Sequence, residues 1–66
     1  MKHTESKVVL TEVHDESGDL IKIIATDQWG EHAYDFLWTE GEPNTPENRV
    51  EFRGWVNRFL ENKGLV

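Results

Sequence analysis

Residues 31–40 read EHAYDFLWTE, and their alternation is the strongest structural pattern in the chain. Successive side chains of a β-strand point to opposite faces of the sheet. One parity of this stretch consists of His32, Tyr34, Phe36 and Trp38, and the other contains Asp35 and Leu37. The pattern therefore predicts a strand with an aromatic row on one face and a mostly polar row on the other.

Two further strands are expected before this one, at residues 7–14 (KVVLTEVH) and 20–26 (LIKIIAT), because both stretches are rich in β-branched residues. Between them, DESGD at 15–19 is typical of a three-residue hairpin loop with Gly18 in the left-handed conformation. Such a loop predicts Val13 opposite Ile21 and Glu12 opposite Lys22. A register slipped by one residue would set Val13 against Lys22 and Glu12 against Ile23, so it is less favourable by cross-strand pairing.

The second turn is expected at Asp27-Gln28-Trp29-Gly30, with Trp29-Gly30 as a two-residue loop. This loop predicts Ala25 opposite Tyr34 and Ile23 opposite Phe36. The aromatic row would then lie beside Ile21, Ile23 and Ala25 of the second strand and Val9, Thr11 and Val13 of the first. The three strands together predict an antiparallel β-meander with one apolar face.

A helix is expected to follow, from Pro46 to about Lys63. Thr45 suits the N-cap position, Pro46 the first helical position and Gly64 the terminator. An apolar stripe at helical spacing consists of Phe52, Trp55, Val56 and Phe59. The predicted fold class is α+β, a three-stranded antiparallel β-meander with one C-terminal α-helix packed on one face (β-β-β-α). Residues 7–66 would form a single small domain after a flexible tail at residues 1–6.

One helix cannot cover both faces of such a sheet. The expected uncovered face carries five aliphatic residues, Val8, Leu10, Leu20, Ile24 and Leu37. An apolar cluster rimmed by charge suggests a contact surface for a homodimer or a partner. The alternative is that these are scattered exposed aliphatic residues, which are common on protein surfaces.

The chain is acidic, with a net charge of −6. Residues 11–42 contain nine acids and one base, which gives them a net charge of −8. The acids are Glu12, Asp15, Glu16, Asp19, Asp27, Glu31, Asp35, Glu40 and Glu42. They predict contact with a basic protein surface, and carboxylates on alternate strand residues, about 6.6 Å apart, could imitate nucleic-acid phosphates. The alternative is that the acids only keep a small apolar protein soluble. Trp29 in the second turn is a candidate aromatic anchor for the same partner, or a cap on the core.

No motif for catalysis, cofactor binding or metal binding is present. The chain has no cysteine, which excludes disulfides and thiolate metal sites. The serines, Ser6 and Ser17, belong to no nucleophile elbow, and the histidines, His3, His14 and His32, lack the spacing of a zinc site. His32 is expected to pack at the edge of the core. No apolar run approaches the roughly 20 residues that span a bilayer, so a cytoplasmic protein without membrane contact is expected.

We therefore expect a non-enzymatic interaction protein that binds a basic protein surface, as an inhibitor or nucleic-acid mimic. In size, charge and composition the chain resembles many small phage or mobile-element proteins that inhibit host enzymes. One alternative is a nucleic-acid-binding module that uses the helix arginines Arg49, Arg53 and Arg58, although nucleic acid is an unfavourable partner for so acidic a chain. Another is an accessory subunit of an enzyme.

Overall fold

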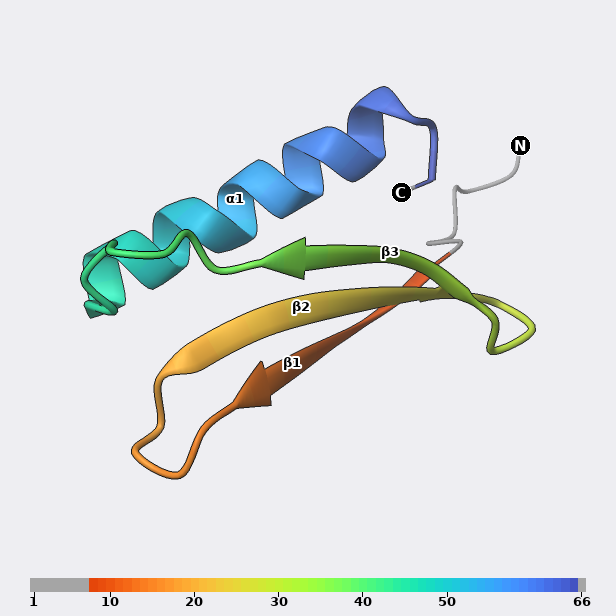
Figure 1. Ribbon diagram of the computed structural model, residues 1–66. Helices are drawn as coiled ribbons and strands as arrows, with labels where there is room; N and C mark the ends of the chain where they lie inside the picture. Colours follow the sequence, from red (N-terminus) through yellow and green to blue (C-terminus); the bar gives the residue numbers. More distant parts are fainter. Residues whose placement is uncertain (1–7, 66) are drawn as a thin grey trace.

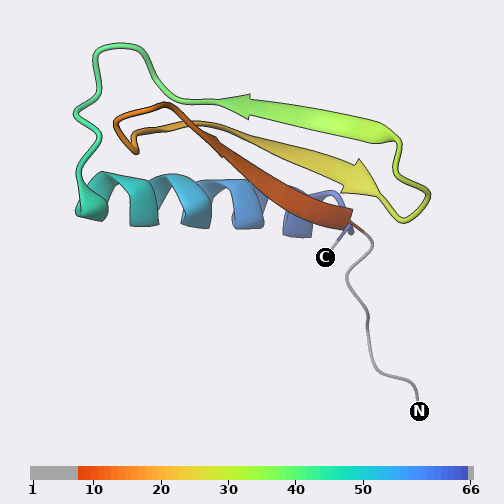
Figure 2. The same cartoon turned by 90° about the horizontal axis from the view of Figure 1, so that it is seen from below.

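A computed structural model describes residues 8–65 of the chain. The elements are β1 (Val8–His14), β2 (Leu20–Asp27), β3 (His32–Leu37) and α1 (Pro46–Asn62). The strands form one antiparallel sheet in the order β1-β2-β3, and α1 lies along one face of it (Figures 1 and 2). The predicted β-β-β-α fold is therefore confirmed. The tail expected at residues 1–6 lies outside the described residues.

The ends of α1 follow the sequence prediction. The Thr45 hydroxyl accepts a hydrogen bond from the backbone N–H of Asn48 at 3.2 Å, and Pro46 is the first helical residue. At the other end, the N–H of Leu65 donates to the carbonyl of Leu60 at 2.9 Å, after Gly64 has ended the helix. Both ends thus satisfy backbone groups that the helix itself leaves without partners.

Aromatic contacts join the sheet to the helix. The ring of Phe36 meets Trp55 and Phe59 edge-on, with centroids 5.6 and 5.3 Å apart. Tyr34 meets Phe59 edge-on at 5.2 Å, and Trp38 contacts Phe52 at 5.1 Å. The buried aliphatic residues beneath these rings are Val8, Leu20, Ile23, Ala25, Val56 and Leu60. The prediction that the aromatic row packs against the helix stripe is confirmed for Tyr34, Phe36 and Trp38.

The first turn has the predicted loop, but the strands beyond it have the register that we judged less favourable. The N–H of Gly18 donates to the carbonyl of Asp15 at 3.0 Å, and Gly18 has φ +92°. A β-bulge then follows, because His14 pairs with Leu20 while Val13 pairs with Lys22, which leaves Ile21 as an extra residue in β2. From there on the register is shifted by one residue relative to the prediction.

The bulge changes which side of β1 faces the helix. Val8 and Leu20 are in the core, with exposed fractions of 6% and 1%, so their expected place on the uncovered face is wrong. Glu12 lies opposite Ile23 and reaches Arg53 on α1, whereas Val9 and Val13 lie on the other face. The prediction weighed only cross-strand pairs, and it missed the gain from burying Leu20 and pairing Glu12 with the helix.

The second turn shows the reverse outcome. Its loop has three residues, not two, because Asp27 N–H donates to the carbonyl of Glu31 at 2.8 Å and Gly30 has φ +85°. A second bulge at Ala33 then restores the predicted pairs of Ala25 with Tyr34 and of Ile23 with Phe36.

The second bulge also moves His32 out of the aromatic row. His32 is exposed, and its Nε2 lies 2.8 Å from Oδ1 of Asp35. Residues three apart in a regular strand point to opposite faces, so this contact depends on the extra residue between them. The expectation that His32 packs at the edge of the core is therefore wrong.

Candidate functional site

The uncovered face of the sheet has a different membership from the predicted one. By the observed pairing, its apolar residues are Val9, Val13, Ile24 and Leu37, and we call them the outer-face cluster. Leu37 is 66% exposed, whereas Ile24 is half-buried. Of the five aliphatic residues predicted here, Ile24 and Leu37 remain. Leu10 is exposed but lies on the helix side of β1, in the same row as Val8.

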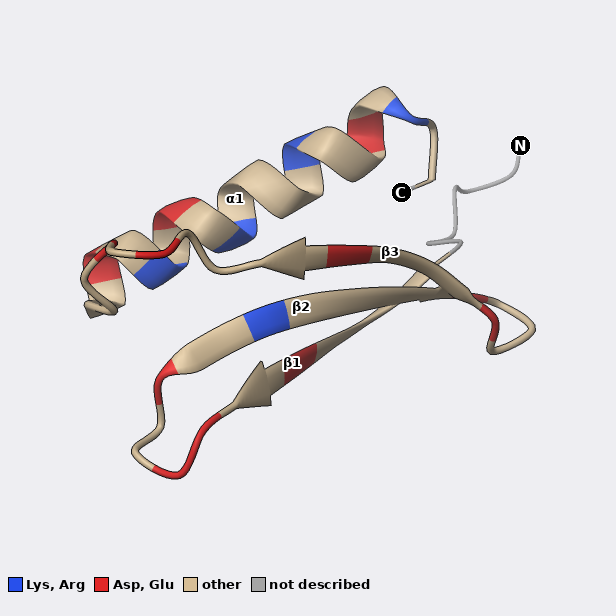
Figure 3. Ribbon diagram, viewed as in Figure 1, with Lys and Arg blue, Asp and Glu red and all other residues tan. Residues whose placement is uncertain are grey.

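Acidic residues from two segments lie at the same end of the molecule (Figure 3). We define this acidic end as Asp15, Glu16 and Asp19 of the β1–β2 turn together with Glu40 and Glu42 of the β3–α1 loop. All five residues are exposed. Within the described part of the chain, none of their carboxylates pairs with a Lys, Arg or His side chain. The end therefore presents five negative charges to solvent.

Asn44 fixes the two segments of the acidic end against each other. Its Oδ1 accepts from the N–H of Leu20 at 2.9 Å, and its Nδ2 donates to the carbonyl of Leu20 at 2.9 Å. Arg49 on α1 donates in turn to both oxygens of Asn44. One amide side chain thus acts as a short strand partner for the first residue of β2.

The remaining predicted acids lie elsewhere. Asp27 and Glu31 belong to the turn at the opposite end of the sheet. Glu12 and Asp35 lie within strands on opposite faces, and each has a cationic or histidine partner. The fold therefore does not present a regular row of strand carboxylates that imitates phosphates, because the acids of the chain concentrate in loops.

Glu12 and Arg53 tie β1 to the helix. Arg53 Nε donates to one carboxylate oxygen of Glu12 at 2.6 Å and Nη2 donates to the other at 3.1 Å. These hydrogen bonds, more than the charge of the guanidinium and of nearby His14, hold the pKa of Glu12 below its ordinary value. The pKa of Arg53 is raised by the same contact. Glu12 is thus a structural carboxylate and contributes little to the exposed charge.

Asp15 combines a structural role with its place in the acidic end. Its Oδ1 accepts from the hydroxyl of Ser17 at 2.8 Å and from the N–H groups of Ser17 and Asp19. The Ser17 hydroxyl, followed by the backbone N–H of Asp19, lowers the pKa of Asp15 from its ordinary value. The carboxylate therefore stays ionised over the whole neutral range.

The helix arginines form no common surface for phosphates. Arg49 is bound to Asn44 and Arg53 to Glu12, so two of the three are engaged within the fold. Arg58 is exposed on α1. Of the three helix arginines that the sequence suggested for binding phosphates, one consequently remains available to the nucleic-acid alternative.

Trp29 lies in the second turn and is 77% exposed. Its backbone N–H donates to Oδ1 of Asp27 at 2.9 Å. This bond fixes the backbone of the turn, while the indole ring lies outside the core. Of the two interpretations of Trp29, this exposure agrees with an anchor more than with a cap on the core.

The candidate serine and histidine side chains among residues 8–65 make local contacts. The Ser17 hydroxyl donates to Asp15, and His14 Nε2 lies 3.2 Å from Oε1 of Glu12. Among residues 8–65, no three His, Asp or Glu side chains lie close enough together to hold a metal ion. His3 and Ser6 lie outside the described residues. No helix in the described part of the chain is long and apolar enough to cross a membrane.

The sequence interpretation missed the role of Asn44 and the presence of a cleft beside α1. Asn44 directly precedes the helix N-cap in the loop EGEPNT, where asparagine is also an ordinary turn residue, so its type alone did not reveal its contact with Leu20. The cleft could not be predicted from the sequence, because it depends on how the β3–α1 loop lies against the helix. The chain matches no known protein-family model, no curated protein and no solved structure.

Proposed function

We propose that the protein is a small, non-enzymatic, cytoplasmic interaction protein whose acidic end binds a basic surface of another protein. The observation that carries the proposal is the assembly of five exposed carboxylates from two segments far apart in the sequence. Asn44 joins the backbones of these segments, so the two loops that carry the charge are held at the same end of the molecule. A fixed cluster of one sign favours a partner surface of the opposite sign.

The acidic end suits an inhibitor that covers a basic functional groove. Charges at the rim of an interface accelerate encounter and select partners by sign, and they contribute less to the final affinity. Proteins that bind nucleic acid present such basic grooves. Inhibition by occupying a groove of this kind is the form of the proposal closest to nucleic-acid mimicry, with loop carboxylates in place of phosphates.

The uncovered sheet face would supply a second contact, between two copies of the chain. Lys22 lies opposite Val13 and Leu37, and Asp35 lies opposite Ile24, so three of the four apolar residues of this face have a charged neighbour across the strands, whereas Val9 lies opposite Thr26. Two copies related by a twofold axis could pair Lys22 of one with Asp35 of the other around the outer-face cluster. Light scattering after gel filtration should give the mass of a dimer, and Ile24→Lys should give a folded monomer. A wild-type monomer at high concentration would contradict this contact.

Affinity capture from the source cell, followed by mass spectrometry, tests the proposed function. The test variant is Glu16→Gln with Glu40→Gln, which removes two charges from the acidic end. The matched control is Glu31→Gln with Glu61→Gln, which removes two exposed charges elsewhere. We expect basic proteins to be captured by the wild type and the control, and to be lost with the test variant or at high salt.

Equal capture by both variants would contradict a role for the acidic end. Measurable binding to DNA or RNA at physiological salt would favour the nucleic-acid alternative. A substrate-dependent activity that is lost on changing His14 or His32 would favour an enzyme subunit.

A further inference from the structure

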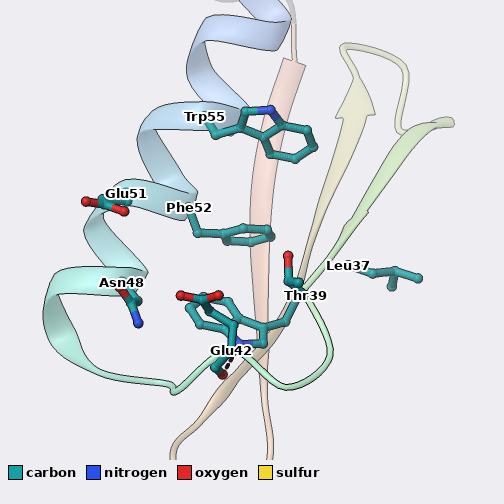
Figure 4. A pocket seen from close by; sticks show the side chains of 8 residues that line it. Leu37, Thr39, Glu42, Asn48, Glu51, Phe52 and Trp55 are labelled. Atoms are coloured by element: carbon teal, nitrogen blue, oxygen red, sulfur yellow. Dashed lines mark hydrogen bonds between the residues drawn. The ribbon is translucent and has the colours of Figure 1, made fainter.

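A cleft of about 350 Å³ lies between the first half of α1 and the β3–α1 loop (Figure 4). Its walls include three aromatic rings, those of Trp38, Phe52 and Trp55, and two carboxylates, those of Glu42 and Glu51. In Figure 4 the rings of Phe52 and Trp55 extend from α1 to the side on which the strands lie, whereas Leu37 points away from the cleft. The cleft is thus lined by aromatic rings together with two carboxylates.

The aromatic wall has accessible ring surface. Trp55 is 48% exposed, and its indole is nearly parallel to the ring of Phe52, with centroids 6.1 Å apart and an interplanar angle of 27°. Trp38 adjoins Phe52 with centroids 5.1 Å apart. The negative face of an aromatic ring attracts cations, and indole attracts them most strongly.

The backbone of Glu42 is held beside this wall by two hydrogen bonds. Trp38 Nε1 donates to the carbonyl of Glu42 at 2.9 Å, and the N–H of Glu42 donates to the carbonyl of Thr39 at 3.1 Å. Glu51 contributes a second exposed carboxylate from α1. The backbone of Glu42 is therefore held at the cleft before any ligand arrives, which reduces the entropy lost on binding.

No basic side chain of the described residues lines the cleft. The two nearest candidates on the helix surface are used elsewhere, since Arg49 binds Asn44 and Arg53 binds Glu12. Among residues 8–65, Glu42 and Glu51 therefore have no cationic partner.

We propose that this cleft holds an arginine side chain of the partner protein. A guanidinium group is planar, stacks on aromatic faces and donates five N–H groups. The cleft matches it with ring faces, the two carboxylates, and the side-chain oxygens of Thr39 and Asn48. A quaternary ammonium would leave all of these acceptors unused, and a lysine ammonium lacks the planar group that stacks.

This inference rests on the proposed function, because it supplies the anchoring contact for a basic partner. Glu42 belongs both to the acidic end and to the cleft. An arginine in the cleft would therefore carry its neighbouring residues toward the remaining carboxylates of that end.

The test is an NMR titration of the full chain with three blocked tripeptides, acetyl-Gly-X-Gly-amide, where X is arginine, lysine or citrulline. Citrulline keeps the planar shape of arginine without its charge. We expect the arginine peptide to shift the indole N–H signals of Trp38 and Trp55, and to leave that of Trp29, at the far end of the sheet, unchanged. Lysine and citrulline should shift them at least threefold less at equal concentration.

A matched pair of variants completes the test. Glu51→Gln should weaken the arginine-dependent shifts several-fold, whereas Glu61→Gln, an exposed change later on α1, should leave them unchanged. Equal shifts with arginine and lysine, equal shifts at Trp29, or no shifts would each overturn the inference. If the acidic-end variants still lose captured proteins while the arginine peptide does not bind, the inference fails and the proposed function stands. If the arginine peptide binds but the acidic-end variant still captures the same proteins, the proposed function fails while the inference about the cleft stands.

Discussion

The two hairpin turns have the same local structure and different surroundings. Both follow the pattern Asp-x-x-Gly-acid, at 15–19 and 27–31. In each, Oδ1 of the first aspartate accepts two backbone N–H groups, and the glycine has positive φ. A β-bulge follows each turn, at Ile21 and at Ala33. Turn chemistry of this kind is therefore local, since it is repeated at opposite ends of the sheet.

The difference between the turns lies in what holds the strand that follows. After the first turn, Leu20 is clamped by Asn44 and buried, and the turn contributes to the acidic end. After the second turn, His32 is exposed, and the loop carries the exposed Trp29. The first turn is thus joined to the β3–α1 loop, whereas the second has no such tether among the described residues. Identical turns can serve different purposes because the contacts beyond them differ.

The largest expected effect tests the first bulge. Leu20→Ala should lower the free energy of unfolding by about 2–5 kcal/mol, because the side chain is fully buried. Ile21→Ala should cost about 1 kcal/mol or less, because Ile21 is 41% exposed. Urea unfolding followed by tryptophan fluorescence measures both. A larger loss for Ile21 than for Leu20 would mean that the strand has the register without the bulge.

The tether of the first turn gives the next effect. Asn44→Ala removes three side-chain hydrogen bonds, one from Arg49 and two with Leu20, and leaves the part-buried N–H and carbonyl of Leu20 without protein partners, which should cost about 1–3 kcal/mol. Asn48→Ala is the control, since its amide makes one exposed bond to the carbonyl of Pro43. Thermal unfolding of the two variants compares them, and equal losses would contradict the proposed clamp.

The likeness of the turns predicts equal costs for their glycines. Among the described residues, and apart from the glycine itself and its two chain neighbours, no atom lies within 4 Å of a Cβ at Gly18 or Gly30, so alanine at either position meets only the backbone penalty of positive φ. That penalty is about 1–2 kcal/mol. Clearly unequal losses at Gly18 and Gly30 would show that the turns are not equivalent.

Gly54→Ala within α1 should instead stabilise the protein by up to about 1 kcal/mol, because the one described side chain close to the new Cβ is the flexible end of Arg58, at 3.4 Å.

The smallest effect distinguishes the turns by one hydroxyl. Ser17 donates to Asp15, whereas the corresponding residue of the second turn, Trp29, has no hydroxyl. Ser17→Ala should therefore raise the pKa of Asp15 toward its ordinary value of 3.8, as NMR titration of the carboxyl carbon would show. Because the folded pKa is lowered, the stabilisation by this carboxylate is present above pH 3.8 and is lost as pH falls through the lowered pKa. An unchanged pKa in the variant would contradict the role of the hydroxyl.

The acidic end and the cleft were only partly predictable. The residue types of the acidic run are evident in the sequence, but nine acids in one stretch do not reveal which share a surface. Glu12 pairs with Arg53 and Asp35 pairs with His32, so neither belongs to the acidic end. The spacing of the aromatic row and of the helix stripe predicted that Trp38 meets the side of α1 that carries Phe52 and Trp55, but no spacing in the chain places Glu42 beside them.

The sequence by itself determined the three strands, both turn positions, the helix with its caps and the aromatic row, because each depends on residues close together in the chain. Only the tertiary structure decided which face of β1 is buried. The alternation of side chains along β1 is compatible with either of its faces being buried, and a single extra residue at Ile21 in β2 changes which face is buried. The observed register buries Leu20 and pairs Glu12 with Arg53, and both contacts join segments far apart in the sequence.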